Sequence, residues 1–259
     1  MTDGAVGSSS ERIESVGALD PESRPAVYAV LSSLADNKYV LGRRYAEWCT
    51  GAPMLESAVA AAAMAQDELG HARSFYPLLR GFPEVTETDT TEESGWQSRP
   101  ARAMACLDRK FVSWTDFVAA NFLVDTALTA LLGAATGSAY EPLGQRARKI
   151  LQEEAPHWIH GAGWIRRLAA DPDARPILEG SLRAAWDDAF TWFGQADDPV
   201  MNRLVAGGLL ACTPDELRER LRTRVVPLLE EASLAVDLAG RGLPWGRWDQ
   251  NTRRLRPAS

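Results

Sequence analysis

Histidine and cysteine are both scarce in this sequence, with three of each among 259 residues. The cysteines, Cys49, Cys106 and Cys212, are odd in number and show no CxxC spacing. This pattern argues against a disulfide framework and favours reduced, buried thiols. The first residues also lack a basic flank followed by an apolar core, so the sequence predicts no signal peptide.

Excess positive charge and long apolar runs are missing as well. The formal net charge is −7, and the Lys and Arg residues are scattered along the chain. This argues against binding to nucleic acid or to an anionic membrane. No apolar run is expected to span a membrane, while the 46% hydrophobic content is ample for a buried core. We therefore expect a cytoplasmic globular protein.

Helical periodicity dominates the rest of the chain, and no strand-like alternation of useful length is present. The predicted helices cover about 21–48, 54–81, 114–136, 142–169, 177–194 and 214–234. The acidic, non-periodic stretch 83–100 is predicted to be a connecting loop. The predicted organisation is a disordered leader at 1–20, a helical domain at 21–240 and a tail at 241–259. The predicted fold class is all-α, a helical bundle with two helical hairpins forming a four-helix core.

Two of the three histidines occur in the same short motif, Glu-x-x-His. The stretches "MAQDELGHARSF" and "LQEEAPHWIHGA" contain Glu68 with His71 and Glu154 with His157. Residues three apart lie on one face of a helix, so both side chains of each pair can point toward the same bound ligand. A carboxylate and an imidazole arranged in this way form half of a transition-metal site. Two such pairs on two helices are much stronger evidence than one.

Hairpin geometry predicts which residues face these motifs. Reflection through the turn at Pro53 places Lys38 opposite Glu68, and reflection through the turn near 140 places Asp125 opposite Glu154. Asp125 lies in the apolar stretch "FLVDTAL", where an unpaired charge would cost several kcal/mol. With a rise of about 1.5 Å per residue, both sets lie about 20 Å from their turns. We therefore expect the two motifs to converge with Asp125 and Lys38.

Neighbouring residues have weaker interpretations. Asp67 and Glu153 could hydrogen-bond the imidazoles, although ordinary exposed helix charge explains them equally well. Pro156 removes a backbone hydrogen bond and could produce a bulge that aims Glu154 and His157. Tyr45 could line the same cavity, although a core position is the simpler interpretation. His160 is expected to be a packed or surface histidine.

The pattern is that of the ferritin-like di-iron carboxylate proteins. More narrowly, "LADNKYVLGRRYAEWCTGAPMLE", "QDELGHAR", "FLVD" and "EEAPHWIHGAGWIRRL" resemble the phenylacetic acid catabolic family over residues 25–235. That family comprises the catalytic and structural subunits of phenylacetyl-CoA epoxidase. The resemblance implies a ferritin-like fold and a di-iron centre that activates oxygen in the catalytic subunit. In the structural subunit it implies the same fold with metal ligands lost.

The resemblance also implies site residues and partners. Its metal ligands map onto Glu68, His71, Asp125, Glu154 and His157, and we predict iron, or else manganese, as the cofactor. Glu68, Glu154 and Lys38 are the predicted catalytic residues. A separate reductase, an acyl-CoA substrate and a paralogous ferritin-like subunit follow from the same resemblance, within a homo- or hetero-oligomer.

One position departs from the family pattern. The sixth expected ligand, a Glu on the first helix, is replaced by Lys38. A protonated lysine has no lone pair for a metal, but it could act as counterion to the carboxylates. The leading hypothesis is therefore a subunit of a di-iron oxygenase, and the alternative is a metal-free structural subunit that assembles with a catalytic paralogue. A simple storage or oxidase ferritin is a third hypothesis, less close to the quoted segments.

Overall fold

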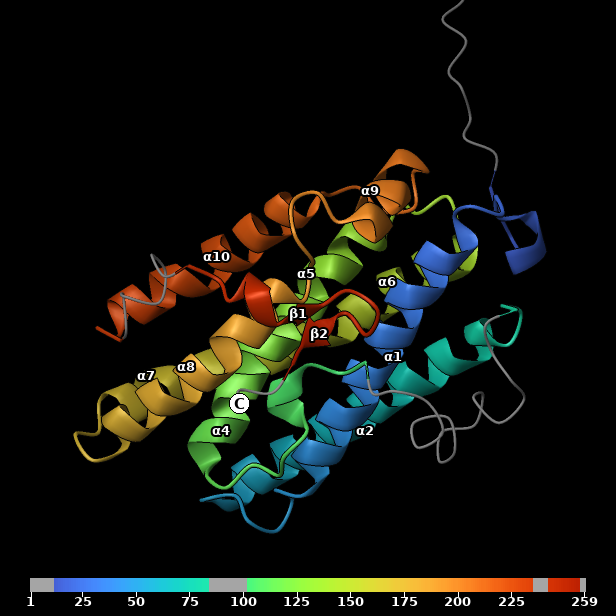
Figure 1. Ribbon diagram of the computed structural model, residues 1–259. Helices are drawn as coiled ribbons and strands as arrows, with labels where there is room; N and C mark the ends of the chain where they lie inside the picture. Colours follow the sequence, from blue (N-terminus) through green and yellow to red (C-terminus); the bar gives the residue numbers. More distant parts are fainter. Residues whose placement is uncertain (1–11, 84–101, 235–241, 257–259) are drawn as a thin grey trace, which may run out of the picture.

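Helices make up most of the computed structural model, which describes residues 12–83, 102–234 and 242–256 (Figure 1). The predicted all-α bundle is confirmed. Its α-helices are α1 (Arg24–Ala46), α2 (Leu55–Leu79), α4 (Trp114–Ala119), α5 (Thr126–Ala135), α6 (Glu141–Glu153), α7 (Ala155–Ala169), α8 (Ala174–Thr191), α9 (Pro199–Ala206) and α10 (Pro214–Glu231). Residues 84–100 of the predicted acidic loop and residues 1–11 of the predicted leader lie outside the described residues.

Two helical hairpins form the core, as the sequence predicts. Helix α1 packs along α2, and α5 packs along α6, while α10 lies against α5 (Figure 1). The first pair approaches closely at Gly42, where an added Cβ would lie 3.0 Å from the Cβ of Glu68. Glycine at this position therefore lets α1 and α2 come together at the level of the Glu-x-x-His motif.

Both helices of the second hairpin are interrupted where the site forms. The predicted helix at 114–136 contains a π-helical segment, Ala120–Asp125, between α4 and α5. The predicted helix at 142–169 ends at Glu153 and restarts at Ala155. Pro156 stands in the first turn of α7, where its missing N–H costs no hydrogen bond. The structure thus places Asp125 and Glu154 at helix irregularities, in agreement with the predicted effect of Pro156.

One apolar run is as long as a membrane span, contrary to the expectation that long apolar runs are missing. The continuous helical run Trp114–Ala135 is long and apolar enough to cross a membrane, judged by length and composition. In the bundle, however, 78% of its apolar window is buried by the other helices. Its hydrophobicity is explained by its central position in the core.

Short elements of secondary structure lie near both ends of the described chain. Residues 12–20 include a 3₁₀ turn at Val16–Ala18, and Ile13 pairs with the chain at Tyr140. Near the other end, β1 (Trp248–Asp249) and β2 (Arg254–Leu255) form a small antiparallel hairpin. These short elements lack the periodicity that revealed the helices, so no sequence pattern predicts them.

A buried ion pair attaches this hairpin to the bundle. The Arg253 guanidinium donates to both carboxylate oxygens of Asp198, at 3.1 and 3.0 Å. Both side chains are almost fully buried, and Asp198 also caps the first turn of α9 by accepting from the Met201 N–H. The ion pair therefore packs residues 248–255, which lie within the predicted tail, against the start of α9.

Candidate functional site

Lys38 lies at the centre of the site, surrounded by three carboxylates. Its Nζ atom donates to Glu68 Oε1 at 2.8 Å, Asp125 Oδ1 at 3.0 Å and Glu154 Oε1 at 2.7 Å. The lysine and Glu68 are fully buried, and the other two are nearly so. The structure therefore brings together residues from α1, α2, the π-helical segment and the α6–α7 break, as the hairpin geometry predicts.

The two histidines complete the site with a crossed pattern of hydrogen bonds. His157 Nδ1 lies 2.8 Å from Asp125 Oδ2, and its Nε2 lies 3.3 Å from Asp67 Oδ2. His71 Nε2 lies 2.8 Å from Glu153 Oε2. Each imidazole therefore contacts an acidic residue from the other motif. His157 contacts Asp67, which precedes Glu68, and His71 contacts Glu153, which precedes Glu154. The predicted support of the imidazoles by Asp67 and Glu153 is thus observed.

Strong electrostatic coupling sets the charges of this site. Burial lowers the pKa of Lys38, but Asp125, Glu154 and Glu68 outweigh it and raise that pKa well above its ordinary value. Burial opposes ionisation of Asp125 too, yet Lys38 and His157 lower its pKa. Burial together with Asp125 raises the pKa of Glu154 to about 7, although Lys38 opposes this.

The histidines supply the remaining positive charge. Burial lowers the pKa of His157, but Asp125 more than compensates and the pKa rises to about 10. The pKa of His71 is also raised, because the Glu68 carboxylate outweighs the effects of burial and of Lys38. Three carboxylates thus face three groups that are able to carry a proton. The buried part of the site can therefore be electrically neutral with no other cation, while the partly exposed Asp67 and Glu153 lie at its edge.

A two-iron centre does not fit this arrangement. Glu68, Asp125, Glu154 and His157 each offer a ligand atom, and these atoms lie within 4.8 Å of one another. Among the described residues they form a buried group that could hold a metal ion. However, Lys38 already binds one oxygen of each of the three carboxylates. Its ammonium group has no lone pair and would repel a metal cation.

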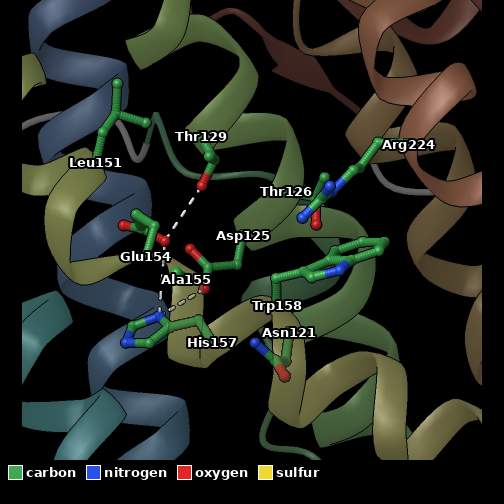
Figure 2. A pocket seen from close by; sticks show the side chains of 10 residues that line it. All are labelled: Asn121, Asp125, Thr126, Thr129, Leu151, Glu154, Ala155, His157, Trp158 and Arg224. Atoms are coloured by element: carbon green, nitrogen blue, oxygen red, sulfur yellow. Dashed lines mark hydrogen bonds and ion pairs between the residues drawn. The ribbon is translucent and has the colours of Figure 1, made fainter.

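A cavity of about 220 Å³ opens beside the site (Figure 2). Asp125, Glu154 and His157 line its inner end, and Trp158 and Arg224 lie at its other side (Figure 2). Asp125 and Glu154 therefore have a direct connection to a space that can hold a small molecule or several waters.

Sequence reasoning missed two residues near the site. The Thr129 hydroxyl donates to Glu154 Oε2 at 3.2 Å, and it lies one helical turn after Asp125, so the i, i+4 rule would have found it. Arg224 comes from α10, and only the tertiary packing brings it to the cavity. Tyr45, which the sequence suggested for the same cavity, is fully buried. Burial raises the pKa of its hydroxyl most, and the negative charges of Asp125 and Glu68 raise it further.

His157 should make the stability of the protein depend on pH. Its folded-state pKa of about 10 exceeds the ordinary value of 6.5, so its contribution is complete below pH 6.5 and is lost as the pH rises toward 10. We expect the free energy of unfolding to fall between pH 6.5 and 9.5 by at most about 4 kcal/mol. Urea unfolding of the metal-free protein at several pH values measures this slope.

A matched control is available one turn further along α7. The pKa of His160 is lowered to about 4, mainly by burial, so this residue stays neutral throughout the tested range. His157→Gln should flatten the slope between pH 6.5 and 9.5, whereas His160→Gln should leave it unchanged. Equal slopes in wild type and His157→Gln would show that the imidazole of His157 is not held protonated by Asp125.

Fold and site together define a class of protein. A bundle of two helical hairpins, with a Glu-x-x-His motif on one helix of each, is a ferritin-like protein with the residue pattern of a di-iron carboxylate centre. Residues 6–254 match the family model described as "Phenylacetic acid catabolic protein". The chain belongs to this family.

Two relatives from Escherichia coli (strain K12) agree with that assignment, namely the subunits of 1,2-phenylacetyl-CoA epoxidase lettered A and C. The chain is 27% identical to the first over 192 residues, which cover 73% of this chain and 61% of that protein. It is 25% identical to the second over 225 residues, which cover 86% of this chain and 89% of that protein. The chain therefore spans less than two thirds of the first relative but most of the second.

Proposed function

We propose that this protein is a metal-free, non-catalytic subunit of a multicomponent oxygenase of the phenylacetyl-CoA epoxidase type. The contact of Lys38 Nζ with Glu68, Asp125 and Glu154, at 2.7 to 3.0 Å, carries the proposal. The ammonium group supplies the positive charge that a metal would otherwise provide. It also keeps three buried carboxylates satisfied without any cofactor.

The role of such a subunit is to assemble with a catalytic paralogue. The names of both relatives are those of subunits of one enzyme, which supports a partner of the same fold. The more complete coverage of the relative lettered C supports a correspondence with that protein. We propose a cytoplasmic complex, built on the helical domain at 21–240, in which other chains provide the reductase and the oxygen-activating centre. Binding of the acyl-CoA substrate is also assigned to the assembled complex.

A single metal ion is the second candidate function. Glu68, Asp125, Glu154 and His157 offer suitable ligand atoms. Glu68 Oε2 and His71 Nδ1 are buried and lack a hydrogen-bond partner within the described residues. These atoms would gain a partner if Lys38 moved aside for an ion. The cost is the loss of three charge-assisted hydrogen bonds, which makes this the weaker candidate.

Metal content distinguishes the two candidates. Protein purified from iron-replete cells should contain less than about a tenth of an equivalent of iron or manganese, because Lys38 already binds the three carboxylates. A true structural metal site would instead retain its metal tightly through purification. Elemental analysis of the intact chain measures this. A His71→Ala, His157→Ala double variant is the control and should contain the same trace amount. Stoichiometric metal that disappears in the double variant would contradict the metal-free proposal and support the single-ion site.

A further inference from the structure

The cavity beside the site has the chemistry of an anion site. We propose that it binds a small carboxylate, with the Arg224 guanidinium as the partner of the carboxylate group. The ligand would lie between α5, α7 and α10, with its apolar part against Leu151 and Trp158 (Figure 2). This inference rests on the proposed metal-free state of the neighbouring site, in which Lys38 and His157 offset the charges of Asp125 and Glu154.

Arg224 is the first observation behind the proposal. Its guanidinium carbon lies 4.0 Å from the ring centroid of Trp158, so the aromatic ring holds the cation at the cavity. Within the described part of the chain, no acidic side chain forms an ion pair with Arg224. An arginine that is positioned but unpaired, with planar donors facing a cavity, matches the geometry of a carboxylate.

The acidic residues that line the cavity do not oppose an anion as strongly as their number suggests. The two oxygens of Asp125 already bind Lys38 and His157. Those of Glu154 bind Lys38 and Thr129. All four oxygens are therefore occupied, and Lys38 and His157 offset their charges. The groups left for a ligand are donors, namely the Arg224 guanidinium and the Thr126 hydroxyl.

The size of the cavity limits the ligand. A volume of about 220 Å³ is enough for a single-ring or short-chain acid, but not for a nucleotide. Leu151 and Trp158 supply apolar surface, whereas the donors lie toward α5 and α10. A compact acid with one carboxylate and an apolar body satisfies both parts of the wall.

Calorimetric titration of the purified chain tests the proposal with benzoate, butyrate and the neutral analogue benzamide. Benzoate should bind with a dissociation constant below about 10 mM and at least about tenfold more tightly than benzamide, because a charge-assisted hydrogen bond is lost in the amide. Arg224→Gln should weaken benzoate binding about tenfold, and Leu151→Phe should weaken it by reducing the cavity volume. Butyrate should respond to Arg224→Gln in the same way.

The same helix provides a matched control. Arg222 also stacks on an aromatic ring, that of Phe190, but does not line the cavity. Arg222→Gln removes the same charge from α10 and should leave benzoate binding unchanged.

Thermal melts establish that each variant is folded. Arg224→Lys, which keeps the positive charge, should retain partial binding of benzoate. Equal binding of benzoate and benzamide, or equal losses in the two glutamine variants, would overturn the proposal. Metal content is measured separately, so this outcome is distinct from failure of the proposed function.

Discussion

Lys38→Glu is expected to destabilise the metal-free protein and to create a metal site. The substitution removes the ammonium group that binds Glu68, Asp125 and Glu154 and adds a fourth carboxylate to the same buried space. Breaking a buried ion pair costs about 3 to 5 kcal/mol, so the melting temperature should fall by about 10 °C. The variant regains the carboxylate that the family resemblance expects on the first helix. Added Mn²⁺ or Fe²⁺ should therefore raise its melting temperature strongly and that of wild type only slightly.

A neutral substitution separates charge from ligation. Lys38→Met removes the positive charge without adding a ligand, so it should also lower the melting temperature, but it should acquire less metal than Lys38→Glu. Melts with and without metal, together with elemental analysis, measure both effects. A Lys38→Glu protein that is as stable as wild type without metal, and binds no more metal, would show that the side chain at position 38 does not face the carboxylates.

Arg253→Met should have the second large effect, at the opposite end of the chain. It leaves the buried carboxylate of Asp198 without its cation, at a cost of about 3 to 5 kcal/mol. Because Asp198 also caps α9, the loss should spread from the hairpin at 248–255 to that helix. Chemical denaturation should show the reduced stability. Relative to wild type, the rate of amide hydrogen exchange should increase more in α9 than in α2.

The double variant Asp198→Asn, Arg253→Met is the control for this prediction. Asparagine keeps the cap on the Met201 N–H but carries no charge, so the pair of substitutions should cost less than Arg253→Met alone. An Arg253→Met protein with wild-type stability would mean that the Arg253–Asp198 ion pair contributes little to the stability of the domain. If the double variant is less stable than the single one, the buried charge of Asp198 is not the source of the loss.

Much of the site could be predicted because it depends on local rules. The Glu-x-x-His spacing places both side chains of a motif on one face of its helix. The antiparallel hairpin then determines which residue of the partner helix lies opposite that motif. Lys38 reaches Glu68 for that reason. The π-helical segment at Ala120–Asp125 has no comparable signal, since its hydrophobic pattern differs little from that of an α-helix.

Other features depend on contacts that no sequence period records. Arg224 lies far along the chain from Trp158, and the packing of α10 alone brings the two together. The hairpin at 248–255 is too short for a strand pattern, and its attachment involves two ion pairs between distant residues, Arg253–Asp198 and Arg254–Asp108. Such pairings between distant charged residues could not be selected from the many alternatives that the sequence allows.

The central position of Lys38 also has a genetic consequence. Lysine codons and glutamate codons differ only in their first base, so a single nucleotide change converts the residue at position 38 from a cation into a carboxylate. The other groups around it are already in place, because Glu68, Asp125, Glu154 and both histidines surround this position. A gene for a self-neutralised subunit of this kind therefore lies one mutational step from a gene whose product has a full set of metal ligands.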